Sequence, residues 1–220
     1  MQISAVSKEV NEWSGSVLIA GVLEGTIEKQ IGLFKTIIKD TFLSQRFNEA
    51  KFEGKKSQKL SIELIEGNIK KVVFVGLGKA ETLRVDDLRK AVALVARQVF
   101  SYERKLGIFF PWDVFDPSAA ACAVGEAVKL SSIKDLRFKS ESKESTPIDE
   151  VELIGLDNHA TKIAIAEINP ICEGVKFARE LVSAPPNSLT PHQMANEAKK
   201  LATDYGLDLK ILDKKKCEEQ

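Results

Sequence analysis

Residues 178–191 read ARELVSAPPNSLTP, and this stretch decides how the chain is divided. It starts as the end of an apolar-striped helix, which Pro185-Pro186 interrupts because proline fixes φ and has no amide donor. A turn follows, and Thr190-Pro191 is a typical helix start. We therefore expect a fixed elbow between two packed bodies.

The composition is that of a globular chain with no overall charge. Of 220 residues, 44% are hydrophobic and 29% are charged, which is enough apolar surface for a core. The 32 basic residues balance 32 acidic ones. The whole chain therefore offers no electrostatic field that attracts nucleic acid or an anionic membrane.

The N-terminus and the cysteines indicate a cytoplasmic protein. No run approaches 18 apolar residues, and residues 1–15 lack the pattern of a signal peptide, so we expect neither secretion nor membrane insertion. Cys122, Cys172 and Cys217 are odd in number and have no CxxC spacing, which favours reduced thiols acting as small core residues.

Strands and helices alternate along residues 1–156. The apolar runs predict strands at 3–6, 16–23, 60–64, 71–75, 105–110 and 151–155, the first pairing beside the second. Helical spacing predicts helices at 27–47 (one helix or two), at 85–102 and from 117 after an Asp116 cap. This order predicts an α/β fold with a mixed or largely parallel sheet covered by helices.

A long helix is expected from about 158 to 182. Its predicted apolar stripe is Ile168, Ile171, Val175, Ala178 and Val182. Pro170 should kink or restart this helix, with Asn169 as a cap.

Beyond the elbow, the sequence predicts the opening of a second α/β domain. Thr190 and Gln193 fit a reciprocal capping box, 207–212 fits a strand, and a further helix is expected from Asp213. One strand and its helices cannot bury both faces of a sheet, so we expect the remainder of this domain to be missing.

The elbow is flanked by residues that fit one family pattern: Gly174, Lys176 and Phe177 before it, and Leu201, Gly206 and Asp213 after it. In these residues the chain resembles the start of the catalytic domain of the cytosol (leucyl) aminopeptidases, the M17 metallopeptidases. The VGLGK turn at 75–79 is also typical of the N-terminal domain of that family. The family usually has Asn where this chain has Ser183.

The resemblance implies a domain organisation and an activity. Residues 1–156 would be a macro-like N-terminal domain, 157–182 a connecting helix, and 183–220 the incomplete start of the catalytic domain. The whole enzyme would be a cytoplasmic, hexameric peptidase that releases N-terminal amino acids from peptides, using two divalent metals, Mn or Zn. The family's metal and catalytic residues lie beyond 220, so no catalytic, metal or cofactor residue is assigned here, and this chain alone is expected to be inactive.

Other candidate sites in the sequence are weak. Gly76-x-Gly78-Lys79 follows a strand, where bare amides can cradle phosphate, but it lacks the remaining residues of a P-loop or dinucleotide fingerprint. A structural turn is favoured. The isolated His159 and His192 lack the spacing of a zinc site.

The paired acids have a structural interpretation as well. Asp86-Asp87 and Glu218-Glu219 fit solvated helix ends better than a general acid and base. The elbow at Pro185-Pro186-Asn187 is interpreted as a rigid hinge in preference to a wall of a substrate pocket.

Two other functions stay open. A macro-like domain could be a module that binds a nucleotide or ADP-ribose, with Gly76–Lys79 as the candidate contact. Some bacterial members of the family also bind DNA and act in regulation. Lysines 51, 55, 56 and 59 are the candidates for that role, although a solvated loop explains them equally well.

Overall fold

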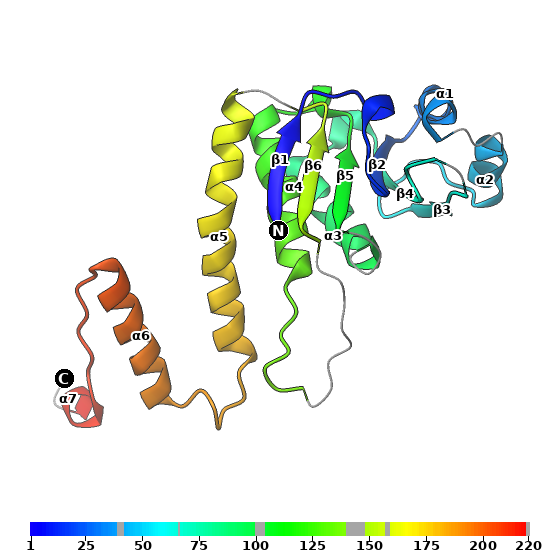
Figure 1. Cartoon of the computed structure of the whole chain (residues 1–220). Helices are drawn as coiled ribbons and strands as arrows, with labels where there is room; N and C mark the ends of the chain where they lie inside the picture. The colour runs from blue at the N-terminus through cyan, green and yellow to red at the C-terminus, as the bar shows by residue number, and fades with distance from the viewer. Residues whose placement is uncertain (39–41, 66, 100–103, 140–147, 157–158, 219–220) are drawn as a thin grey trace. The chain divides into compact units, whose positions relative to one another are not determined.

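The computed structural model describes residues 1–220 except 39–41, 66, 100–103, 140–147, 157–158 and 219–220 (Figure 1). The chain divides into two units, 1–173 and 174–220. The charge and serine content of segment 140–147 predict a surface loop, and this segment lies outside the described residues.

The first unit is built on a six-stranded sheet with the order β1-β6-β5-β2-β4-β3. Its strands are β1 (Gln2–Val6), β2 (Val17–Leu23), β3 (Lys59–Glu63), β4 (Lys71–Gly78), β5 (Lys105–Phe109) and β6 (Glu150–Ile154). All neighbours are parallel except β3 and β4, which are antiparallel. The predicted α/β class with a mixed sheet is confirmed.

The predicted position of the first strand was wrong. β1 pairs with β6, so that Ala5 lies opposite Leu153, and it does not pair with β2. β1 and β2 both run parallel to the strands between them, and parallel neighbours need a crossover connection. The segment between them, which contains a short 3-10 helix at Val10–Glu12, instead leads across β6 and β5.

Helices cover both faces of the sheet. The helices of this unit are α1 (Ile27–Ile38), α2 (Leu43–Glu49), α3 (Val85–Val99), α4 (Pro117–Ser132) and the first part of α5 (His159–Ser183). The region 27–47 thus forms two helices. Asp116 caps α4 as predicted, because its Oδ1 accepts the Ala119 amide at 2.8 Å.

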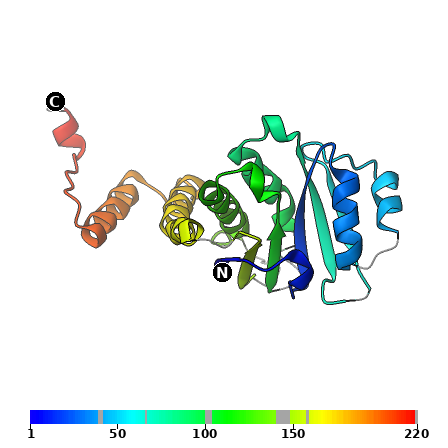
Figure 2. The ribbon, with the colours of Figure 1, turned by 90° about the horizontal axis from the view of Figure 1, so that it is seen from above.

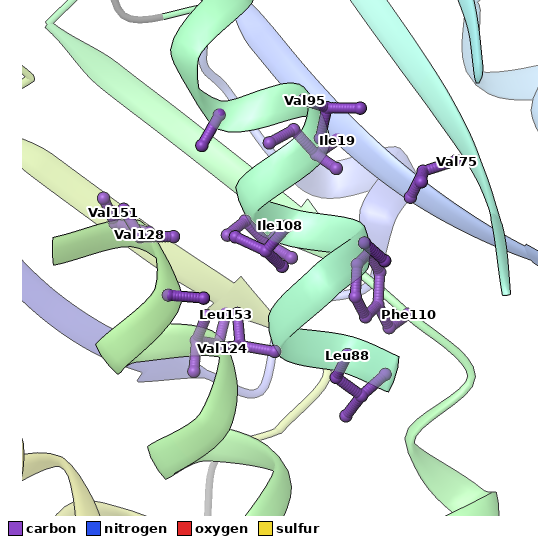
Figure 3. Packing of buried hydrophobic residues seen from close by; sticks show 14 of the residues in the cluster. Ile19, Val75, Leu88, Val95, Ile108, Phe110, Val124, Val128, Val151 and Leu153 are labelled. Carbon is purple, nitrogen blue, oxygen red and sulfur yellow. The ribbon is translucent and has the colours of Figure 1, made fainter. Parts of the chain in front are cut away.

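The side chains of β2 alternate between two apolar layers. Val17 and Ile19 pack in the layer beneath α3 and α4, whereas Leu18 and Ala20 pack in the layer beneath α1 and α2. Figure 3 shows the first layer, where Ile108 and Leu153 meet side chains of α3 and α4. Burial on both faces explains why β2 is apolar at every position.

α5 packs beside α4, as Figures 1 and 2 show. Its buried residues are Thr161, Ala164, Ile168 and Cys172. The predicted stripe was therefore wrong beyond Ile168, since Ile171 and Val182 are exposed. The buried stripe starts about two turns earlier in the sequence, at Thr161, and ends at Cys172.

α5 continues through Pro170 as one helix, so the predicted restart was wrong. Asn169 does not act as a cap. Its Oδ1 accepts a hydrogen bond from Nζ of Lys129 on α4 at 2.6 Å. Packing of Ile168 and Cys172 on either side of the proline stabilises the helix there.

The second unit contains the end of α5, the elbow, α6 (Pro191–Tyr205) and α7 (Lys214–Glu218). Thr190 caps α6, its Oγ1 accepting the Gln193 amide at 3.3 Å. The reciprocal half of the capping box was wrong: among the described residues, the Thr190 amide makes no hydrogen bond to the Gln193 side chain, whose Nε2 donates to Oε1 of Glu197 at 3.5 Å. Gly206, with φ of 64°, ends the helix.

The predicted strand at 207–212 was also wrong: no strand is assigned there in the described structure. A strand needs a hydrogen-bonded neighbour, and this unit's described residues form only helices and irregular segments. None of the described residues from 173 to 218 is buried. The apolar residues of this unit therefore remain largely uncovered, with Leu207 61% and Tyr205 73% exposed.

Candidate functional site

The first place to look for a ligand is the crevice between the carboxyl ends of β2 and β5. The chain leaves β2 toward α1 on one face and leaves β5 toward α4 on the other. Such a change of direction between neighbouring parallel strands is where open α/β sheets bind ligands.

Apolar side chains fill this crevice. A methyl group on Gly21 would lie 2.6 Å from the ring of Phe110 and 2.9 Å from Leu77, and both of these side chains are buried. Trp112 lies against Phe110 with ring centroids 5.5 Å apart, and its indole N–H donates to the Ile154 carbonyl at 2.6 Å. The hydrogen bond from Trp112 thus joins the segment after β5 to the carboxyl end of β6, and Phe110 packs against the same ring.

The glycine turn at the end of β4 supports the structural interpretation made from its sequence. The Gly76 amide donates to the Gln58 carbonyl at 2.9 Å, and the Gly78 amide donates to the Gly54 carbonyl at 2.8 Å. Gly78 has φ of 83°, which favours glycine. These two amides are therefore already satisfied and do not point to a phosphate.

Gln58 organises the loop that covers this turn. Its Oε1 accepts the amides of Glu53 at 2.9 Å and Lys55 at 3.0 Å, and its Nε2 donates to the Lys51 carbonyl at 3.1 Å. The loop from 51 to 58 is consequently fixed by one side chain. Sequence reasoning missed this role, because a glutamine among lysines has no distinctive pattern.

The lysines proposed as a DNA contact are partly neutralised. Lys55 pairs with Glu53, and Lys56 Nζ lies 2.8 Å from Oδ2 of Asp87. The hydrogen bond with Glu53 raises the pKa of Lys55, and the hydrogen bond from Lys56 lowers the pKa of Asp87. Lys51 and Lys59 are exposed. This arrangement favours a solvated loop over a phosphate-binding surface.

A hollow of about 660 Å³ lies where β2 leads into α1. It is lined by Glu24, Gly25, Thr26, Ile27, Glu28, Lys29, Glu53 and Lys55. The lining contains three carboxylates and two ammonium groups, so the hollow does not favour an anion such as a nucleotide phosphate.

The remaining sequence candidates do not converge on one site. His159 begins α5 and His192 lies in the first turn of α6, both exposed. Asp86 pairs with Lys90 at 2.9 Å, and this hydrogen bond lowers the pKa of Asp86. An acid held in its charged form is a poor general acid. Glu219 lies outside the described residues.

At the elbow, the Pro185 carbonyl accepts the amides of Ser188 at 2.8 Å and Leu189 at 2.9 Å. The turn is therefore held by its own backbone. Its interpretation as a rigid hinge or as a wall of a substrate pocket stays a prediction.

The described residues contain no group of three or more His, Cys, Asp or Glu side chains placed to hold a metal ion. In the same part of the chain, no helix is both long and apolar enough to cross a membrane.

The three cysteines have different surroundings. Cys172 is buried, Cys122 is half-buried with its thiol donating to the Ala164 carbonyl at 3.3 Å, and Cys217 is exposed. The prediction of a core role is thus confirmed for Cys172 and wrong for Cys217. Burial raises the pKa of Cys122, so less of its reactive thiolate is present at pH 8.

We expect one thiol to react quickly with dithionitrobenzoate at pH 8 in the folded chain. That thiol is Cys217, and the other two should react on the order of 100-fold more slowly because they need local opening. The Cys217→Ser variant should lose the fast phase. Fast reaction of all three thiols in folded protein would contradict the packing of α4 against α5.

Comparison with known proteins gives consistent matches. Residues 21–142 match the sequence profile of the cytosol aminopeptidase family, N-terminal domain. A probable cytosol aminopeptidase of Prochlorococcus marinus (strain MIT 9211) is 46% identical over 218 residues, covering 99% of this chain and 44% of the relative. A second one, from Synechococcus sp. (strain CC9311), is 38% identical over 221 residues and also matched over 44% of its length.

Solved structures match as well. A tomato leucine aminopeptidase mutant superimposes with a TM-score of 0.82 at 26% identity, over 100% of this chain and 46% of that one. The bottromycin maturation enzyme BotP in complex with Mn matches with a TM-score of 0.64 at 24% identity, over 89% of this chain and 38% of that one. The latter likeness concerns the fold alone. The chain thus spans less than half the length of these relatives.

Proposed function

This chain belongs to the cytosol aminopeptidase family, and from that premise we propose that it is the N-terminal portion of a two-metal leucyl aminopeptidase. The observation that carries the proposal is the match of 99% of the chain to 44% of the length of a probable cytosol aminopeptidase. The TM-score of 0.82 with a leucine aminopeptidase over the whole chain supports it. The whole protein would release N-terminal amino acids from peptides.

The proposed organisation keeps three parts: an N-terminal domain at 1–156, a connecting helix at 157–182 and the start of the catalytic domain at 183–220. The apolar residues of the last part support this proposal, because a folded domain buries such residues. Leu207 and Leu209 are 61% and 44% exposed, in a segment that has no assigned helix or strand. In the whole protein, the remaining part of the catalytic domain would cover these leucines.

The described residues of this chain do not fit a two-metal site, since they bring no three potential ligands together. We propose that the metals, Mn or Zn, are held by residues that the whole protein has in addition to these. BotP, a protein of the same fold, has been solved in complex with Mn. The chain by itself would then be inactive toward peptides.

The role proposed for this chain is to scaffold the catalytic part and to support assembly. The six-stranded sheet with helices on both faces is a complete core that can serve as a rigid platform. The family resemblance implies a cytoplasmic homohexamer, and light scattering on the whole protein would measure its mass.

Hydrolysis of leucine p-nitroanilide with added Mn²⁺ tests the proposal. The 220-residue chain is compared with a protein extended to the natural stop codon of its gene. Activity in the longer protein alone is the expected result. Lack of activity in both, with the reading frame ending at Gln220, would overturn the proposal and give the nucleotide-binding module first place.

A further inference from the structure

α5 has two parts that differ in how they are supported. Thr161, Ala164, Ile168 and Cys172 are buried, and Cys172 is the last buried residue of the described chain. From Glu173 to Ser183, no side chain of the helix is buried. Full burial of α5 side chains therefore ends at Cys172, and beyond it Val175 and Phe177 are only partly buried, so that α5 draws less stabilisation from apolar packing after Glu173.

Lys129 of α4 contacts α5 next to Cys172, the last fully buried residue of the helix. Its Nζ lies 2.6 Å from Oδ1 of Asn169 and 3.5 Å from Oε1 of Glu173, one helical turn apart. The Lys129 side chain is only 18% exposed, so these contacts are partly shielded from water. We call Lys129, Asn169 and Glu173 the α4–α5 clamp.

The helix itself is weak next to this clamp. Pro170 has no amide donor, so the carbonyl of Ala166 loses its hydrogen bond within the helix. Gly174 follows directly after the clamp, and glycine is among the poorest helix formers.

Close packing does not explain this glycine. A methyl group on Gly174 would meet nothing within 4 Å, whereas one on Gly125 of α4 would collide with Ile168. The glycine of α4 is needed for helix contact, and the one in α5 is not. The division of the chain into two units also falls between Glu173 and Gly174.

We propose that α5 has a hinge at Gly174 whose fixed end is the α4–α5 clamp. Residues 159–173 stay on α4, while the helix from Gly174 onward opens and bends independently. The proposal concerns α5 alone and does not depend on peptidase activity.

Hydrogen exchange measured by mass spectrometry on the 220-residue chain tests the hinge. Amides 175–182 should exchange at least about tenfold faster than amides 163–172. Gly174→Ala should slow exchange in 175–182 about fivefold, the equivalent of about 1 kcal/mol of helix propensity. Equal protection along the whole of α5, or no effect of Gly174→Ala, would overturn the proposal.

Gly32→Ala is the matched control. Gly32 is also a helical glycine, in α1, and a methyl group there would meet nothing within 4 Å. The substitution brings the same gain in helix propensity and should leave exchange in α5 unchanged. A slowing in α5 by this variant would show that the effect is global, and would overturn the assignment to Gly174.

Lys129→Met tests the clamp while keeping the apolar stem of the side chain. Fast exchange should then extend back to about Asn169. Arg89→Met, which removes the 2.9 Å ion pair between Arg89 of α3 and Glu126 of α4, is the control and should leave 169–173 protected. Unchanged protection of 169–173 in Lys129→Met would show that Lys129 does not fix the end of the hinge.

Discussion

Gly76→Ala is expected to lower the free energy of unfolding by about 3 kcal/mol. A methyl group on Gly76 would overlap the Lys55 carbonyl oxygen and lie 2.8 Å from the Gly54 carbonyl carbon, both of which are backbone atoms. The loop at 51–58 would have to lift from β4. The hydrogen bonds from the amides of Gly76 and Gly78 would then be lost.

Urea unfolding followed by circular dichroism measures this effect. Gly32→Ala, a helical glycine with open space around it, serves as the control and should be neutral or stabilising. A loss below about 1 kcal/mol for Gly76→Ala would show that the loop adapts easily, and that β4 does not need glycine at this position.

Phe74→Ala is expected to lower the free energy of unfolding by about 3–5 kcal/mol. Phe74 lies on β4, is fully buried, and forms edge-to-face pairs with Phe34 at 5.0 Å and Phe47 at 4.9 Å between ring centroids. Its removal leaves a cavity that the sheet and the helices α1 and α2 enclose. Phe34 and Phe47 each lose their ring contact with Phe74.

Phe138→Ala is the matched control for this variant. Phe138 is 51% exposed and contacts the Arg137 guanidinium at 5.3 Å from its ring centroid. Its removal should change the free energy of unfolding by about 0.5 kcal/mol. Similar losses for Phe74→Ala and Phe138→Ala would contradict the aromatic layer beneath α1 and α2.

The sequence predicts the first unit well because its signals are local. The continuous apolar run of β2 and the alternation along β3 identify strands without knowledge of their partners. Asp116 before Pro117 marks the start of α4 in the same way. The pairing of β1 with β6 could not be predicted, since it depends on contacts between residues almost 150 positions apart.

Side-chain partners and missing neighbours explain the other errors. Asn169 fits a cap by sequence, but it binds Lys129 on another helix. Residues 207–212 have an apolar pattern typical of a strand, yet pattern alone cannot provide the neighbouring strand that completes its hydrogen bonds. The role of Gln58 depends on three backbone groups brought together by the fold.

At the candidate site, too, local features could be predicted from the sequence, whereas contacts between distant side chains could not. Sequence patterns favoured a structural role for Gly76–Lys79, and the hydrogen bonds of its amides support that role. The filling of the crevice by Phe110 and Leu77 was beyond sequence reasoning, because it requires the positions of side chains from two strands. The proposed activity rests on the family resemblance. It does not rest on a cluster of reactive residues, since the described residues contain no group placed to hold a metal ion.

The most direct test is a chimera in which this chain replaces the matched 44% of the Prochlorococcus marinus (strain MIT 9211) relative. The measurement is kcat/KM for leucine p-nitroanilide with Mn²⁺, with EDTA as the control that should abolish the rate. If this chain is the N-terminal portion of a leucyl aminopeptidase, the chimera should retain kcat/KM within about tenfold of the relative, about 1.4 kcal/mol in transition-state stabilisation. A folded chimera without hydrolysis, beside an active relative, would contradict that account.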